Sequence, residues 1–261
     1  MEKAVFVVRP ESLALAKNGY GRLYFGQEFC DRLIPSKDAL KEAVDHAGKA
    51  SMAFTLVTPY LTEEQFPRWV ALAEALEGLL GDFEIVINDW GFLRKLRSLG
   101  TKHPYLLGRL LSKQKRGPQI LRILDKVPAT MVDHFRRSTS DVPVTVEFLK
   151  KMGFRRIELD NLLHGIEREN ELPASIYYPY GYITTTRLCL SNSCTNRTES
   201  LRAIFPCGRE CQKLHFSLSH KDMPVTVTLA GNSQFFVNEK LPGELEKLSI
   251  DRLVHEPEIP L

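Results

Sequence analysis

Two short apolar runs, MAFTLV at Met52–Val57 and FEIVI at Phe83–Ile87, enclose a long helical pattern at Thr62–Leu80. The helical pattern opens with the start signal Thr-Glu-Glu and then places apolar residues at helical spacing, namely Phe66, Trp69, Val70, Leu72, Ala73 and Leu76. A strand, a helix and a second strand in this order predict two parallel strands joined by a crossover helix.

The same alternation extends in both directions along the chain. Further strands are expected at Arg22–Phe25, Tyr105–Leu107, Arg156–Leu159 and Ser175–Tyr178, and further helices at Lys37–His46 and Val144–Met152. At 261 residues the pattern favours a closed (β/α) barrel of the TIM-like kind, with an open doubly wound sheet as the second choice. No glycine-rich phosphate loop follows any of these strands, which weakens the nucleotide-binding form of the open sheet.

The pattern changes after Cys211. Leu214–Leu218 and Val225–Leu229 alternate as antiparallel strands do, and Gln234–Val237 follows the turn Gly231-Asn232. We therefore expect residues 1–261 to form one barrel-like domain, in which residues 185–240 form a cysteine-rich loop and a small C-terminal antiparallel β appendage.

Composition narrows the class of protein. The chain is 43% hydrophobic, contains no run long enough for a membrane span, and does not open with a secretory signal. Its five cysteines are an odd number, so a disulfide scaffold is not expected and the predicted location is the cytoplasm, with reduced thiols. A net charge of +3 does not by itself argue for nucleic acid as a partner, and leaves that partner open.

Four of the five cysteines lie between positions 189 and 211: Cys189, Cys194, Cys207 and Cys211. Soft thiolate ligands at such spacing are typical of an iron–sulfur cluster or a zinc site. Cys207 and Cys211 flank Gly208, which lets the backbone curl so that both sulfurs face one centre. The apolar flanks of Cys189 suit either core packing or a ligand at a strand end.

Cys30 is the remaining thiol, and a barrel gives it two alternative roles. It follows the expected strand Arg22–Phe25, and the cysteine cluster follows the expected strand Ser175–Tyr178. If barrel closure makes these first and last strands neighbours, Cys30 reaches the cluster at the carboxyl face, where barrel active sites lie. Alternatively, Cys30 is a small buried hydrophobe.

Polar residues at other strand ends predict a pocket at the same mouth. Asp89, Arg109 and Asp160 each follow an expected strand, and we take them as candidate catalytic residues facing a small polar or anionic substrate. For Asp89 and Asp160 the alternative is helix capping, because each precedes a helical pattern. Lys113 and Lys115, which follow Arg109, suit an ordinary solvated helix face.

Several motifs together resemble the collagenase-like protease family, which is peptidase family thirty-two of the unclassified mechanism group. They are Ile87–Gly91, Gly153–Leu159, Tyr180-Gly181 before a threonine-rich strand, and Ser191–Cys194 with the later cysteine pair. The similarity runs from about Tyr24 to the region of Val237.

The resemblance implies a barrel with a 4Fe–4S cluster, oxygen-independent hydroxylation of a ubiquinone precursor or of RNA bases, prephenate as hydroxyl donor, and a partner subunit from the same family. The spacing of Cys194, Cys207 and Cys211 is similar to that of the ubiquinone branch, in which the fourth ligand comes from an early loop, here the loop of Cys30. The segment before Cys194 is longer than the family signature and contains Cys189, so either cysteine completes a quartet.

Three functions follow as hypotheses. The first is an iron–sulfur enzyme, or one subunit of it, for hydroxylation or related redox chemistry on a small molecule or RNA base. The second is a peptidase, as the family label says, although the chain has no His-Glu-x-x-His or Gly-x-Ser-x-Gly motif. The third is a non-catalytic binding module whose cysteine loop is held by zinc.

Overall fold

Eight parallel strands close into a barrel in the computed structural model, which describes residues 1–17, 19–193 and 206–261. Around the barrel the strands follow the order β1-β12-β7-β6-β5-β4-β3-β2. Their bounds are β1 (Glu2–Val7), β2 (Arg22–Gly26), β3 (Ala53–Val57), β4 (Glu84–Ile87), β5 (Tyr105–Leu107), β6 (Phe154–Asp160), β7 (Ala174–Tyr178) and β12 (Ile250–His255). The expected (β/α) barrel is confirmed.

The barrel is closed by different strands from those that we predicted. We expected Arg22–Phe25 and Ser175–Tyr178 to be the first and last strands and to lie side by side, and this was wrong. β1 and β12 lie between β2 and β7, and pair with each other in parallel from Glu2↔Arg252 to Val5↔His255.

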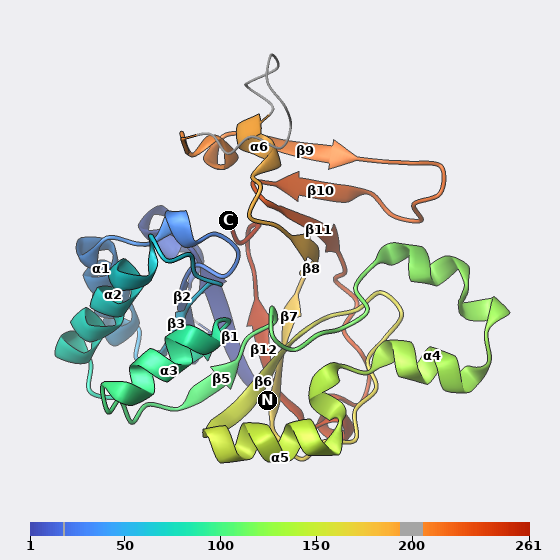
Figure 1. Ribbon diagram of the computed structural model, residues 1–261, viewed down its shortest axis with the longest axis horizontal. Helices are drawn as coiled ribbons and strands as arrows, with labels where there is room; N and C mark the ends of the chain where they lie inside the picture. The colour runs from blue at the N-terminus through green and yellow to red at the C-terminus, as the bar shows by residue number, and fades with distance from the viewer. Residues whose placement is uncertain (18, 194–205) are drawn as a thin grey trace.

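Helices connect the consecutive strands from β2 to β6 and lie around the outside of the barrel (Figure 1). They are α1 (Lys37–Lys49), α2 (Phe66–Leu79), α3 (Trp90–Ser98), α4 (Ala129–Arg136) and α5 (Pro143–Met152). α1 begins where Ser36 Oγ accepts a hydrogen bond from Ala39 N at 3.0 Å, and α5 ends at Gly153 in a left-handed conformation. α2 begins at Phe66 rather than at the predicted Thr62, with a proline in its first turn.

The two faces of the barrel strands bury different groups. Outward residues such as Leu56 and Ile85 pack against Trp69 and other apolar residues of the helices. The interior holds apolar residues such as Phe6, but also a polar set at the amino-terminal end. There Arg252 Nη1 lies 2.7 Å from Glu84 Oε2 and donates to Tyr24 Oη at 2.6 Å.

Glu158 lies in the same interior and is fully buried. Its Oε1 accepts a hydrogen bond from Ser175 Oγ at 3.1 Å, whereas its Oε2 has no hydrogen-bond partner among the described residues. Burial raises the pKa of Glu158 to about 7, against the charges of Arg252 and Arg156, which lower it.

A four-stranded antiparallel sheet covers the carboxyl end of the barrel (Figure 1). Its order is β8-β11-β10-β9, from β8 (Tyr180–Thr185), β9 (His215–Leu218), β10 (Val227–Ala230) and β11 (Ser233–Val237), which confirms the expected β appendage. The short helix α6 (Leu190–Ser193) follows β8.

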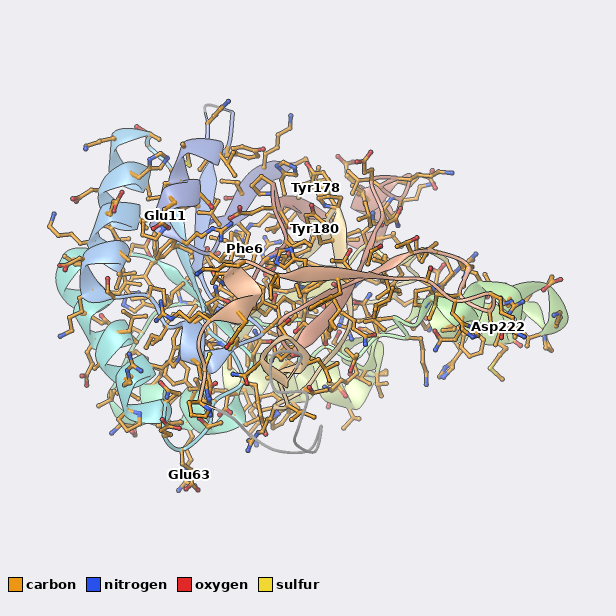
Figure 2. The ribbon with its side chains drawn as sticks, turned by 90° about the horizontal axis from the view of Figure 1, so that it is seen from above. Phe6, Glu11, Glu63, Tyr178, Tyr180 and Asp222 are labelled. Atoms are coloured by element: carbon orange, nitrogen blue, oxygen red, sulfur yellow. The ribbon has the colours of Figure 1, made fainter. Side chains whose placement is uncertain are left out.

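The sheet joins the barrel at β7, where Tyr178 and Tyr180 flank Pro179 (Figure 2). The β9–β10 connection extends away from the barrel, and its Asp222 forms an ion pair with Arg122 at 2.7 Å. No helix in the described part of the chain is both long and apolar enough to cross a membrane.

Candidate functional site

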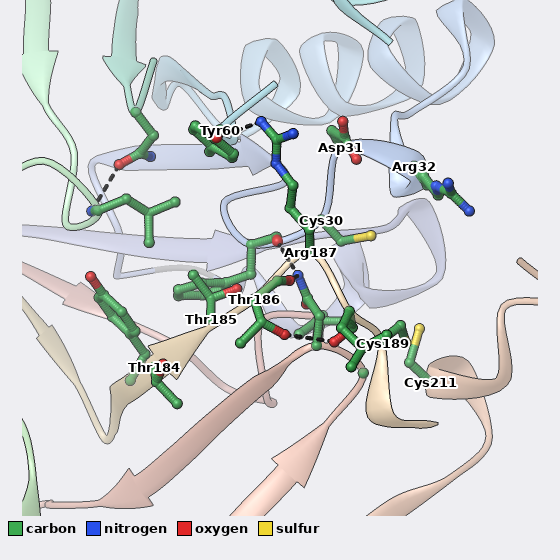
Figure 3. Close-up of a pocket in the computed structure, with 18 of the residues that line it drawn as sticks. Cys30, Asp31, Arg32, Tyr60, Thr184, Thr185, Thr186, Arg187, Cys189 and Cys211 are labelled. Carbon is green, nitrogen blue, oxygen red and sulfur yellow. Dashed lines mark hydrogen bonds between the residues drawn. The ribbon is translucent and has the colours of Figure 1, made fainter. Parts of the chain in front are cut away.

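A cavity of about 850 Å³ lies between the mouth of the barrel and the appended sheet (Figure 3). The loops after β2, β3 and β5 line it from the barrel, and β8 with the segment that follows lines it from the sheet. This is the carboxyl end of the parallel strands, where barrel active sites form.

All four described cysteines line this cavity, and we call it the thiol cavity. Cys30 comes from the loop after β2, Cys189 from the segment after β8, and Cys207 and Cys211 from the segment before β9. Cys211 is buried, Cys30 and Cys189 are half-buried, and Cys207 is exposed. Cys194 lies outside the described residues.

The thiols are close enough to influence one another electrostatically. Burial raises the pKa of the Cys30 thiol to about 12, with smaller contributions from Asp31, Cys211 and Cys207. Burial also raises the pKa of Cys211, and the neighbouring Cys189 and Cys207 act in the same direction. These thiols are therefore protonated at neutral pH unless a cation or metal replaces the protons.

The turn Gly231-Asn232 brings two of the cysteine segments together. Gly231 has a φ of +56°, and a Cβ atom there would lie 3.1 Å from Cys211 Cβ and 2.7 Å from Leu261 Cδ2. Asn232 Nδ2 donates to the carbonyl of Phe29, the residue before Cys30, at 2.7 Å. A residue without a side chain is thus required where the β10–β11 turn meets Cys211.

The thiol cavity has the ligand chemistry of a thiophilic metal centre, but its described residues do not have the geometry of one. No three His, Cys, Asp or Glu side chains within residues 1–17, 19–193 and 206–261 come close enough together to hold one metal ion. The four thiols that line the cavity are nevertheless the soft ligands that iron–sulfur clusters and zinc take.

Arg109 and Asp160 lie directly beneath the thiol cavity, in a buried charge cluster. The Arg109 guanidinium bonds to Glu28 Oε2 at 2.6 Å, Glu256 Oε1 at 2.7 Å and Asp160 Oδ1 at 3.1 Å, and lies 3.9 Å from the centroid of the Tyr177 ring. All four charged side chains are fully buried. Arg109 and Asp160 therefore bind each other rather than facing the cavity.

Arg116 extends the cluster to the cavity wall. Its Nε bonds to Asp160 Oδ2 at 2.5 Å, its Nη2 donates to the carbonyl of Arg109 at 2.8 Å, and its guanidinium lies 4.2 Å from the centroid of the Tyr182 ring. The segment from Arg109 to Arg116 forms turns and not the solvated helix face that we considered, although Lys113 and Lys115 are exposed as expected.

Asp89 lies apart from this cluster, at the start of α3. Its Oδ1 accepts from Phe92 N at 2.9 Å, and its Oδ2 accepts from Leu61 N at 3.2 Å. Asp89 thus adopts the capping geometry that was the alternative to a catalytic role.

Two members of the charge cluster, Glu28 and Glu256, were not among the residues predicted from sequence. Glu28 is only two residues from Cys30, and Glu256 directly follows β12, a strand that the sequence reading did not include. Burial raises the pKa of Glu256 to about 8, although the Arg109 charge opposes this. Position at a strand end could have identified Glu28, which follows the expected strand Arg22–Phe25, whereas Glu256 could not be found in this way without β12.

Three cations on the cavity wall form no ion pair with a described residue: Arg32, Lys113 and Arg187. Arg187 crosses from the sheet side towards the barrel, donates to the Tyr60 hydroxyl, and places its guanidinium 4.7 Å from the centroid of that ring (Figure 3). Positive charge on the wall is thus available to an anionic ligand.

Comparison with known proteins does not assign this chain to a family. No family model and no curated protein matches the chain. Among solved structures, the chain is similar to one described as the U32 peptidase Mk0906, with a TM-score of 0.48 and 9% identity over 100% of this chain and 94% of that one. A similarity this weak assigns neither a family nor an activity.

Proposed function

We propose that the thiol cavity holds a 4Fe–4S cluster and that the protein acts in oxygen-independent hydroxylation, or related redox chemistry, on a small molecule or RNA base. The observation that carries the proposal is the convergence of Cys30, Cys189, Cys207 and Cys211 on one cavity from separate segments of the chain. Packing alone gives no reason for so many thiols to meet around a space that is also lined by cations without an ion-pair partner among the described residues.

Two cysteine quartets remain open for such a cluster. Cys207, Cys211 and Cys194, which lies outside the described residues, belong to both, and either Cys30 or Cys189 is the fourth ligand. We favour Cys30, because its loop is fixed against the sheet by the contacts of Phe29 with Asn232 and Tyr182. Such a cluster supplies one-electron transfer when bound.

The substrate that suits the rest of the wall is small and polar or anionic. Arg187, Lys113 and Arg32 supply positive charge, while Phe29 and Tyr182 supply an aromatic surface. An anion in the cavity would take the place of the carboxylate partner that these cations lack among the described residues.

Anaerobic reconstitution with iron and sulfide tests the proposal. We expect brown protein with about four irons per chain, the composition of a 4Fe–4S centre. Cys207→Ala and Cys211→Ala should abolish iron binding. Cys30→Ser should lose iron while Cys189→Ser, the matched control from the other side of the cavity, should retain it.

Other metal contents would decide against this function. Colourless protein that binds one zinc and no iron would support the zinc-stabilised binding module instead. Hydrolysis of casein or gelatin by metal-free protein, retained in Cys211→Ala, would support the peptidase. Iron loss in Cys189→Ser with retention in Cys30→Ser would keep the cluster but assign the other quartet.

A further inference from the structure

The buried guanidinium of Arg109 connects the two sides of the thiol cavity. We propose that Arg109 is a positioning residue for this cavity, fixing the Cys30 loop against the sheet whose connections carry Cys189 and Cys211. The consequence of this inference for iron binding rests on the proposed function. The contacts that support the inference concern only how the thiols are arranged.

On the barrel side, Arg109 binds the Cys30 loop through Glu28. Arg109 Nε and Nη2 donate to Glu28 Oε2 at 2.9 and 2.6 Å, and Arg109 N donates to Glu28 Oε1 at 3.3 Å. Asn88 Nδ2 also donates to Oε1, at 3.4 Å. Both oxygens of Glu28 therefore accept hydrogen bonds, and the residue has little freedom to move.

Phe29, between Glu28 and Cys30, carries this restraint to the sheet. Its ring lies 5.1 Å from that of Tyr182 on β8 and 5.2 Å from that of Phe235 on β11, and the Arg109 guanidinium lies 5.3 Å from its centroid. The loop is thus held by a charge on one side and by aromatic packing on the other.

On the sheet side, Arg109 holds the beginning of β8. Its Nη1 donates to the carbonyl of Tyr180 at 3.3 Å, and its own carbonyl accepts from the Tyr182 hydroxyl at 3.0 Å. Asp160 Oδ1, which receives Arg109 Nη1, also accepts from Tyr182 N at 3.2 Å. β8 leads directly to the segment of Cys189, so one side chain sets the relation between both thiol-bearing walls.

Glu28 and Glu256 provide a matched pair for testing this role. Both are fully buried and both bond to Arg109 Nη2, at 2.6 and 2.7 Å. Glu256 follows β12 and is not near a cysteine in sequence, and its Oε2 has no hydrogen-bond partner among the described residues. A glutamine at 256 can therefore accept from Arg109 through its carbonyl, whereas a glutamine at 28 must direct its amide NH₂ at a donor.

The test measures the separation of two thiols in metal-free, full-length protein. In a chain that keeps Cys30 and Cys211 and has serine at the other three cysteine positions, dibromobimane bridges two thiols only when they lie close together. We expect Glu28→Gln to slow bridging about tenfold, the fold-change that corresponds to about 1.4 kcal/mol, because the buried amide NH₂ at position 28 would face a donor and release the Cys30 loop. Glu256→Gln should bridge at the unsubstituted rate.

Equal bridging rates in the two variants, whether both unchanged or both slowed, would overturn the positioning role. If Glu28→Gln does not fold, Glu28→Asp, which keeps the charge but shortens the side chain, should give the same slow bridging. Failure of the proposed function is a separate result. It would appear as wild-type protein that takes up no iron, while the difference between Glu28→Gln and Glu256→Gln in bridging persists.

Discussion

Replacement of Glu158 by glutamine should remove a pH dependence from the stability of the barrel. Glu158 is fully buried in the barrel interior, and burial raises its pKa from 4.5 to about 7. Glutamine keeps the Oε1 that accepts from Ser175 Oγ, and its amide occupies the position of an oxygen without a partner among the described residues. The substitution therefore removes the charge with little change in packing.

The magnitude follows from the difference between the folded and unfolded pKa. A rise from 4.5 to about 7 corresponds to about 3 kcal/mol, at 1.36 kcal/mol for each pKa unit. Because the pKa is raised, the folded protein holds this proton more tightly than the unfolded chain does. The free energy of unfolding therefore falls as the pH rises from 4.5 to 7, and the full loss is present above pH 7.

Urea unfolding between pH 4.5 and pH 8 measures this effect. The free energy of unfolding of Glu158→Gln minus that of wild type should be about 3 kcal/mol larger at the upper end of this pH range than at the lower end. Glu2→Gln is a control of opposite sign, because Arg252 and Arg22 outweigh burial and lower the pKa of Glu2. If Glu158→Gln shows the same pH slope as wild type, Glu158 is ionised in the folded barrel and the reasoning is wrong.

Two further predictions concern residues around the cavity. Asp89→Ala should lower the free energy of unfolding by about 1 kcal/mol through loss of the α3 cap, with unchanged iron content, and loss of activity at unchanged stability would instead favour a catalytic role. Arg187→Gln should lower the ratio of iodoacetate to iodoacetamide alkylation at Cys207 about twofold, since both residues line the thiol cavity and a charge at its wall contributes roughly 0.5 kcal/mol. Lys115→Gln, outside the cavity wall, is its control, and an equal drop in both would argue against an anion site.

The barrel was predictable because most of its strands are apolar and alternate with helices. β12 was not predicted, because its sequence, Ile-Asp-Arg-Leu-Val-His, mixes charges with apolar residues and resembles a surface segment. In the structure Arg252 points into the barrel, where Glu84 and Glu2 neutralise it. Sequence periodicity cannot identify a buried charge whose partners lie on strands far away in the chain.

The site was predictable in its chemistry and less so in its geometry. Cysteine spacing and strand ends indicated which residues to examine, and the structure places Cys30 and Cys189 on one cavity. The sequence did not reveal that Arg109 and Asp160 bind each other below that cavity, because exposure of a charged residue is the ordinary expectation. Only the pairing of Arg109 with three buried carboxylates makes its own burial possible.

The pairing of β1 with β12 has a consequence for biosynthesis. Until β12 is made, a nascent chain can assemble at most an open sheet, with the hydrogen-bonding edges of β1 and β7 both unprotected. Parallel sheets with distant partners form slowly, and exposed edges promote aggregation. The chain should therefore depend on chaperones during translation more than its closed native form suggests, and ribosome-bound chains that lack Ile250–His255 should be the form that chaperones retain.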